Sequence, residues 1–246
     1  MEELRERRAH ECRLTPDRAL GSLDEAEEFL LDRGLLTRTS DCALPSLFEA
    51  CHEEPYAPES PGFGQWPRTK FPWFGRLGAR GYPVLSIHRG KNVLVTDEVA
   101  RLLDPVCRAE LARMEQADPD WARLLRHLGE AGPSELEDLQ LELGLKPKEL
   151  KRLRAPLERC GAVVSRSIVY EEPHRHTSEL RRWDQLVTEA SDGDGLADVV
   201  VAAVRAAVVA PAAEVARWFS WQWYWDDALL DDRRLRHLDG HVALAE

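Results

Sequence analysis

The sequence predicts an α+β protein that is mainly α, in which sets of short helices are closed by β-hairpins. Two observations predict this class. Helical segments with clear start and stop residues recur along the chain, and alternating apolar stretches with turn residues follow them. The 246 residues, of which 43% are hydrophobic, suffice for two or three small domains with packed cores.

The N-terminal third contains two helix starts and one hairpin. Ser22 with Glu25 predicts a capping box, and Gly34 ends the helix that follows. A short helix is expected over residues 46–51. The residues from Pro55 to Pro83 predict a long ordered loop because they combine Pro and Gly with aromatic residues. The stretches YPVLSIH and NVLVT predict a hairpin, and Thr96 caps a helix from Asp97 to about Met114.

The middle third predicts three consecutive helices closed by a β element. Asp118 opens the first helix, Ser134 the second and Lys146 the third, and each ends at a glycine. Pro156 predicts a bend or an early end in the third helix. Three short helices followed by a strand pair are typical of the winged-helix form of the helix-turn-helix motif, with short β wings.

The C-terminal residues predict a second unit of this kind. Helices are expected over residues 196–209 and 211–219, with a third helical region over 223–232. Asp239-Gly240 lies between alternating apolar residues and predicts a hairpin. We therefore divide the chain into a winged-helix-like region with a basic and aromatic loop over 1–117, a middle winged helix over 118–190 and a C-terminal winged helix over 195–246.

Charge and composition exclude several classes of protein. No apolar run reaches the length of a membrane span and the first residues are charged, so we expect a cytoplasmic protein without membrane contact. The five cysteines form no CxxC pair, and P-loop and GxGxxG motifs are missing, so we expect no metal and no cofactor. The net charge is −11, but residues 61–119 carry a net charge of +3.

Two basic stretches are candidate nucleic-acid contacts. Residues 66–91 hold six basic residues and no acidic one, with aromatic residues between them. Basic groups bind phosphates, and aromatic faces stack on unpaired bases; the alternative is that the aromatic residues anchor the loop to the core. The third helix of the middle unit is also basic, and in winged helices it often enters the major groove. The predicted contacts are Trp66, Arg68, Lys70, Trp73, Arg76, Arg80, Lys148, Lys151, Arg152 and Arg154.

The tract from Trp218 to Trp225 contains four tryptophans, one phenylalanine and one tyrosine. A platform for stacking nucleobases is one interpretation. We favour the other, in which these residues are the core where the last unit packs on the rest of the chain.

Four segments resemble one family, the winged-helix DNA glycosylases of the AlkZ-like type, which act in interstrand-crosslink repair. They are LPSLFEA (44–50), RRWDQL (181–186), EVARWFSW (214–221) and RLRHLDGHVAL (234–244), and the resemblance covers most of residues 20–246. It is greatest to a shorter branch of the family. The resemblance implies tandem winged helices around a DNA channel and a role in DNA repair or damage protection.

The resemblance also implies a catalytic Gln-x-Gln or Gln-x-Asp motif after a helix-ending Gly-Leu. Here Thr37 and Thr39 occupy those positions. Threonine hydroxyls are poor at activating water and at stabilising a positively charged sugar. We therefore predict a DNA-binding protein whose partner is duplex or damaged DNA. The alternatives are an active alkyl-base glycosylase with a rearranged site and an acidic protein-interaction module without nucleic-acid binding.

Overall fold

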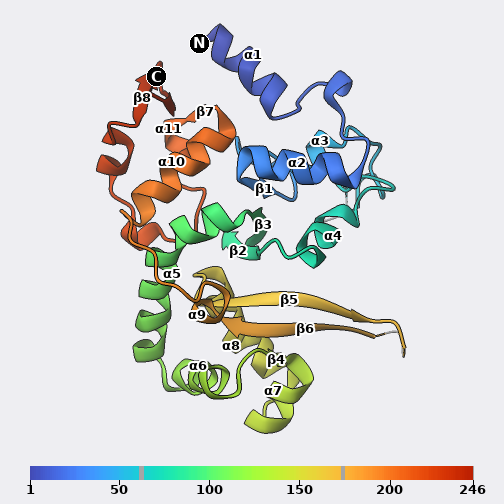
Figure 1. Ribbon diagram of the computed structural model, residues 1–246, viewed down its shortest axis with the longest axis vertical. Helices are drawn as coiled ribbons and strands as arrows, with labels where there is room; N and C mark the ends of the chain where they lie inside the picture. Colours follow the sequence, from blue (N-terminus) through green and yellow to red (C-terminus); the bar gives the residue numbers. More distant parts are fainter. Residues whose placement is uncertain (61–63, 173–174, 246) are drawn as a thin grey trace.

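The computed structural model describes residues 1–60, 64–172 and 175–245. It confirms the α+β class: about 49% of the residues are helical, and three small antiparallel sheets accompany the helices (Figure 1). Within the described ranges, no helix is long and apolar enough to cross a membrane.

The N-terminal region is built on the predicted helix start at Ser22. The Ser22 hydroxyl accepts a hydrogen bond from the Glu25 backbone N–H at 3.1 Å, and the helix ends at Gly34, whose φ is 81°. The elements are α1 (Glu2–Glu11), a 3-10 turn (Pro16–Arg18), α2 (Leu23–Arg33), β1 (Leu35–Thr37), α3 (Leu47–Ala50), α4 (Trp73–Ala79), β2 (Val84–His88) and β3 (Lys91–Val95).

The segment that we predicted as a long loop, Pro55 to Pro83, contains helix α4. Phe74 and Leu77 of this helix are buried against α2 and α3, and this burial stabilises a glycine-containing helix that its local propensity disfavours. Residues 61–63 of the predicted loop lie outside the described residues.

Helix α5 (Asp97–Ala117) links the first region to the second. The Thr96 hydroxyl caps it by accepting from the Val99 N–H, as predicted. Two fully buried carboxylates of α5 form hydrogen bonds with segments that follow later in the chain. Asp104 accepts hydrogen bonds from the Trp183 indole at 2.7 Å and the Ser191 N–H at 2.8 Å, and Glu110 accepts one from the Trp223 indole at 3.1 Å.

The middle region contains three helices and a hairpin, as predicted, but the second helix begins at Leu136 because Ser134 lies in a short strand. Its elements are α6 (Pro119–Ala131), β4 (Ser134–Glu135), α7 (Leu136–Leu143), α8 (Pro147–Arg159), β5 (Val163–Tyr170), β6 (Arg175–Arg182) and α9 (Trp183–Leu186). The expected early end at Pro156 is wrong, because α8 continues to Arg159. Buried Leu153 and Leu157 on both sides of the proline hold the helix against its core. Strands β5 and β6 extend well beyond the helices (Figure 1).

The C-terminal region has less helix than we predicted. Its elements are α10 (Leu196–Ala207), β7 (Val209–Pro211), α11 (Ala212–Val215), two 3-10 turns (Gln222–Tyr224 and Asp227–Asp231), β8 (Leu235–Leu238) and β9 (His241–Leu244). The helix expected over 211–219 ends at Val215 because the large side chains of Trp218 and Phe219 turn into the core. The predicted hairpin at Asp239-Gly240 joins β8 to β9.

The same strand arrangement occurs three times. The sheet orders are β1-β3-β2, β4-β6-β5 and β7-β9-β8, and all pairs are antiparallel. In each sheet, the first strand follows a helix and is short. It pairs with the third strand, which is the second strand of a hairpin. The chain thus repeats one succession of helices and strands over residues 23–95, 119–182 and 196–244.

In the described part of the chain, three apolar clusters form the core. One lies within the N-terminal region around Phe29 and Phe74, and a second lies within the middle region around Leu125 and Leu157. The third joins the sheet of the N-terminal region, α5 and the whole C-terminal region, and it contains Trp183. The first and last regions therefore pack on each other through a shared core.

The tryptophan tract divides between core and surface. Trp218 and Trp221 are buried in the shared core, and the Trp221 indole donates to the Cys160 carbonyl at 2.9 Å. Trp223 is 53% exposed, with Arg113 stacked on its ring. The core interpretation thus describes the first half of the tract.

Candidate nucleic-acid interface

Three of the basic residues predicted near the aromatic loop make structural contacts. The Lys70 ammonium donates to the backbone carbonyls of Leu20 at 2.6 Å and Cys51 at 3.4 Å. Arg80 pairs with Asp24 at 2.7 Å and with Glu27. Arg68 lies 4.0 Å from Glu54 at the surface. Intramolecular hydrogen bonds and ion pairs therefore satisfy these three charges partly or wholly.

The predicted aromatic contacts also serve mainly to hold this loop. The Trp66 ring packs edge-on against Phe48 and is stacked with Phe71, with centroid distances of 5.6 and 6.2 Å. Trp73 begins α4, and the Lys70 ammonium lies 5.4 Å from its ring centroid. The alternative that the aromatics anchor the loop accounts for these contacts. Arg76 is exposed on α4 and makes no side-chain pair among the described residues.

Helix α8 presents three of its four predicted cations on one exposed face. Lys148, Lys151 and Arg152 are exposed and have no acidic partner in the described part of the chain. Arg154 differs, because its guanidinium bonds to Glu158 at 2.6 Å and to the Ser165 hydroxyl at 3.2 Å. Three of the four predicted residues of α8 are thus available to a ligand.

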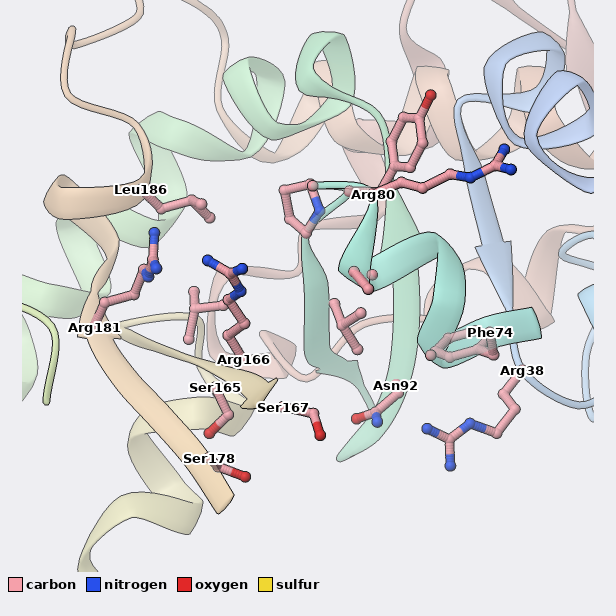
Figure 2. A pocket seen from close by; sticks show the side chains of 18 residues that line it. Arg38, Phe74, Arg80, Asn92, Ser165, Arg166, Ser167, Ser178, Arg181 and Leu186 are labelled. Atoms are coloured by element: carbon pink, nitrogen blue, oxygen red, sulfur yellow. The ribbon is translucent and has the colours of Figure 1, made fainter. Parts of the chain in front are cut away.

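A cleft of about 360 Å³, which we call the arginine cleft, separates α4 and the β2–β3 hairpin from the β5–β6 hairpin (Figure 2). Four arginines line it, together with Asn92 and three serines, and no described lining residue carries a carboxylate. Figure 2 shows Arg166 and Arg181 on the β5–β6 side and Arg38 on the opposite side, beyond Asn92. The lining residues used below are Arg38, Arg80, Asn92, Ser165, Arg166, Ser167, Ser178 and Arg181.

Arg38 has an unusual environment for a cation. It follows β1, and its guanidinium lies over the Trp66 and Phe74 rings, 5.4 and 4.7 Å from their centroids. Its Nε is buried without a hydrogen-bond partner, and no described carboxylate pairs with it. Burial lowers the pKa of Arg38, although an arginine stays protonated at any physiological pH. A half-buried cation without an anion is the kind of group that an anionic ligand would stabilise.

The hairpin side of the cleft supplies two more guanidinium groups. Arg166 of β5 is exposed and makes no side-chain pair among the described residues. Arg181 of β6 pairs with Glu179, while its Nε is buried without a partner. Arg80 points away from the cleft toward α2, as its pairing with Asp24 requires. Arg38 and Arg166 are therefore the two uncompensated charges of the cleft.

A second, more open cleft continues from the first. It has a volume of about 540 Å³, and Arg38 and Asn92 line both clefts. Gly90 and Lys91 line its far end. A Cβ atom placed on Gly90 would lie 3.2 Å from the Arg159 Nε, so the end of α8 abuts this hairpin turn. Arg166, Arg38 and Lys91 thus line two adjoining clefts, and the turn at Gly90 contacts the C-terminal end of α8.

Thr37 and Thr39, at the positions of the glycosylase motif, differ in burial. The Thr37 side chain is buried, and its hydroxyl is 3.2 Å from both the Thr39 and Pro45 carbonyl oxygens. Thr39 is half-buried and lines the second cleft. Thr37 therefore offers no group to a ligand, and Thr39 offers one hydroxyl.

Our sequence predictions missed the central cleft residues, namely Arg38, Arg166 and Arg181. They lie in two different regions of the chain, and the packing of α4 against β5 brings them together. One signal was available: Arg38 lies between Thr37 and Thr39, the positions that the family resemblance singles out. Comparison with protein-family models, curated proteins and solved structures gives no match for this chain.

Proposed function

We propose that this protein binds DNA, with a phosphate backbone lying in the arginine cleft and along the exposed face of α8. The observation that carries the proposal is the charge of the cleft. No described carboxylate lines it, and two of its four arginines, Arg38 and Arg166, make no ion pair among the described residues, in a chain whose net charge is −11. Guanidinium groups bind phosphates in a bidentate manner, and the serine hydroxyls and Asn92 amide add donors of the kind that contact phosphate and sugar oxygens.

The repeated strand order supports a tandem winged-helix interpretation. In the middle region a helix, a short strand, two helices and a two-stranded hairpin follow one another, which is the succession of a winged helix. Under this interpretation α8 is the recognition helix and the protruding β5–β6 hairpin is its wing. Lys148, Lys151 and Arg152 then face the duplex, and Arg166 lies at the base of the wing.

The acidic charge of the chain is compatible with this role because it lies elsewhere. Residues 1–60 carry a net charge of −8 and residues 189–246 a net charge of −6, whereas residues 146–182 carry +5. A local basic surface attracts a phosphate backbone, while acidic regions repel other approaches.

We place the protein with the AlkZ-like winged-helix glycosylases as a binding protein rather than a hydrolase. The buried hydroxyl of Thr37 supports this assignment, because it donates within the fold and cannot position a water molecule. A role in recognising or protecting damaged DNA follows from the same resemblance. Release of free base from alkylated DNA, above a heat-killed control, would instead identify an active glycosylase.

Fluorescence anisotropy with a labelled duplex tests the binding itself. Log affinity should fall linearly with log salt, and each lost phosphate contact should reduce the magnitude of the slope by about 0.9. Arg166→Gln should therefore reduce the magnitude of the salt slope by about 0.9. The substitution should not disturb the fold, because Arg166 makes no side-chain pair among the described residues.

Arg5→Gln provides a matched control. Arg5 is 62% exposed on α1, a helix that lies remote from the β5–β6 hairpin (Figure 1). Its substitution removes the same charge and should leave the salt slope unchanged. Equal effects of the two substitutions would reduce the interaction to unspecific attraction, and no binding of the wild-type protein at about 50 mM salt would refute the proposal.

A further inference from the structure

Three side chains with metal-binding atoms meet beside the second cleft, on the loop after β1 and at the end of β2. They are Asp41, Cys42 and His88, and their ligand atoms all lie within 4.8 Å of one another. The His88 Nε2 atom is 3.4 Å from Asp41 Oδ1 and 3.7 Å from Cys42 Sγ. A tetrahedral zinc ion with bonds of about 2.0–2.3 Å separates its ligand atoms by about 3.3–3.8 Å. The two measured distances fall in that range.

The hydrogen bonds around the cluster hold these atoms in a ligating arrangement. The His88 ring is buried, and its Nδ1 donates to the Trp218 carbonyl at 2.6 Å, which leaves the lone pair on Nε2 facing the cluster. Asp41 Oδ2 accepts from Arg89 at 3.2 Å and from Lys91, while Oδ1 is buried without a hydrogen-bond partner. A histidine oriented through its other nitrogen, and a carboxylate held through its other oxygen, are usual around protein-bound metals.

We propose that Asp41, Cys42 and His88 form a zinc site. The donor set of one carboxylate oxygen, one thiolate sulfur and one imidazole nitrogen is the mixed set that Zn²⁺ accepts. Three protein ligands leave the fourth position of a tetrahedral ion to water or to a ligand in the adjacent cleft. The sequence did not indicate the site, since Cys42 and His88 are 46 residues apart and meet only because the β1–α3 loop folds over β2.

One group in the structure competes with the ion. The Arg89 guanidinium lies 3.1 Å from His88 Nε2 and donates to it. The Arg89 side chain is 44% exposed, so it can turn toward solvent when an ion takes the lone pair. Zinc binding releases the Cys42 thiol proton to solvent, and the Asp41 carboxylate and the Cys42 thiolate then balance the two charges of the ion. Lys91 keeps its hydrogen bond to the outer oxygen of Asp41.

A bound ion would fix the loop that carries the cleft residues. Asp41 and Cys42 follow Arg38 and Thr39 by only a few residues, and β2 anchors His88 in the sheet. The site would thus connect the loop after β1 to the core through three bonds. The inference does not depend on DNA binding, because metal uptake is measured on the protein alone.

Cobalt substitution tests the site with the intact chain. Protein freed of metal with a chelator is titrated with Co²⁺, whose thiolate complexes absorb in the near ultraviolet. We expect one Co²⁺ per chain with a thiolate band, displaced by an equivalent of Zn²⁺. Cys42→Ser should abolish the band, and Asp41→Asn should weaken Co²⁺ binding at least 10-fold.

The control is Cys51→Ser. Cys51 is buried and its thiol donates to the Leu47 carbonyl at 3.2 Å, a bond that serine can also make. This variant should keep the full band. No thiolate band in the wild-type protein, or a band that persists in folded Cys42→Ser protein, would overturn the proposal. If Cys42→Ser fails to fold, unchanged Co²⁺ affinity of Asp41→Asn would do the same.

Discussion

Replacing Arg38 by methionine should weaken DNA binding without destabilising the protein. Methionine keeps the apolar contact with Trp66 and Phe74 but removes the charge. The two cation–π contacts that are lost contribute about 0.5–2 kcal/mol each. Removal of the buried, unbonded Nε recovers about 1–3 kcal/mol. These terms nearly cancel, so the free energy of unfolding should change by less than about 1 kcal/mol.

The effect of Arg38→Met on binding should be much larger. A charge-assisted hydrogen bond to phosphate contributes about 1.5–3 kcal/mol. Its loss corresponds to an increase in Kd of about 10- to 150-fold. The magnitude of the salt slope should also fall by about 0.9. Anisotropy titrations over a range of salt concentrations measure both quantities, and urea denaturation measures stability.

Arg33→Met is the matched control for this experiment. Arg33 is also buried, but its guanidinium pairs with Glu11 at 2.5 Å and with Asp32 at 3.0 Å. Its loss removes the partner of Asp32 and one of the two partners of Glu11, which keeps Arg7 at 2.6 Å. It should cost about 1–3 kcal/mol of stability, with unchanged DNA affinity. If Arg38→Met behaves like this control, Arg38 has a structural role and the reasoning about the cleft is wrong.

Three further outcomes are expected. Lys70→Met should lower the free energy of unfolding by about 1–3 kcal/mol and leave the salt slope unchanged, because the Lys70 ammonium bonds to backbone carbonyls; a flatter slope would contradict this. Replacing Lys151 and Arg152 together by alanine should reduce the slope by about 1.8 with unchanged circular dichroism, since both are exposed; an unchanged slope would remove α8 from the interface. The pKa of Glu110 is lowered, because the Arg113 hydrogen bond and the Tyr224 and Trp223 hydrogen bonds outweigh the opposing effect of burial, so its stabilising contribution is present above about pH 4.5 and is lost as the pH falls through the lowered value. The difference between the thermal melts of wild type and Glu110→Gln should therefore be full at pH 7 and shrink as the pH falls below about 4.5, and a constant difference would contradict this assignment.

Local signals in the sequence predicted the elements well where one residue determines a boundary. Ser22, Thr96 and Asp118 cap their helices as expected, because a side-chain acceptor at a helix start depends only on its neighbours. Helix α4 was missed because burial of Phe74 and Leu77 overrides the weak helix propensity of its glycines.

The candidate site was harder to predict, since it depends on which cations the fold leaves without partners. Lys70 and Arg80 looked available in the sequence, but carbonyls and carboxylates from distant segments use them. Arg166 looked unremarkable, yet it remains unpaired beside the cleft. The sequence shows how many charged residues there are, but tertiary packing determines which of them remain without a partner.

Hydrogen exchange measured by mass spectrometry, with and without a DNA duplex, tests the central claim most directly. We expect slower exchange of the backbone amides over residues 74–83, 164–167 and 178–181, which contain most of the residues that line the arginine cleft, with no change over α1. Slower exchange in the C-terminal region alone, or identical exchange with and without DNA under conditions where binding is saturated, would contradict it.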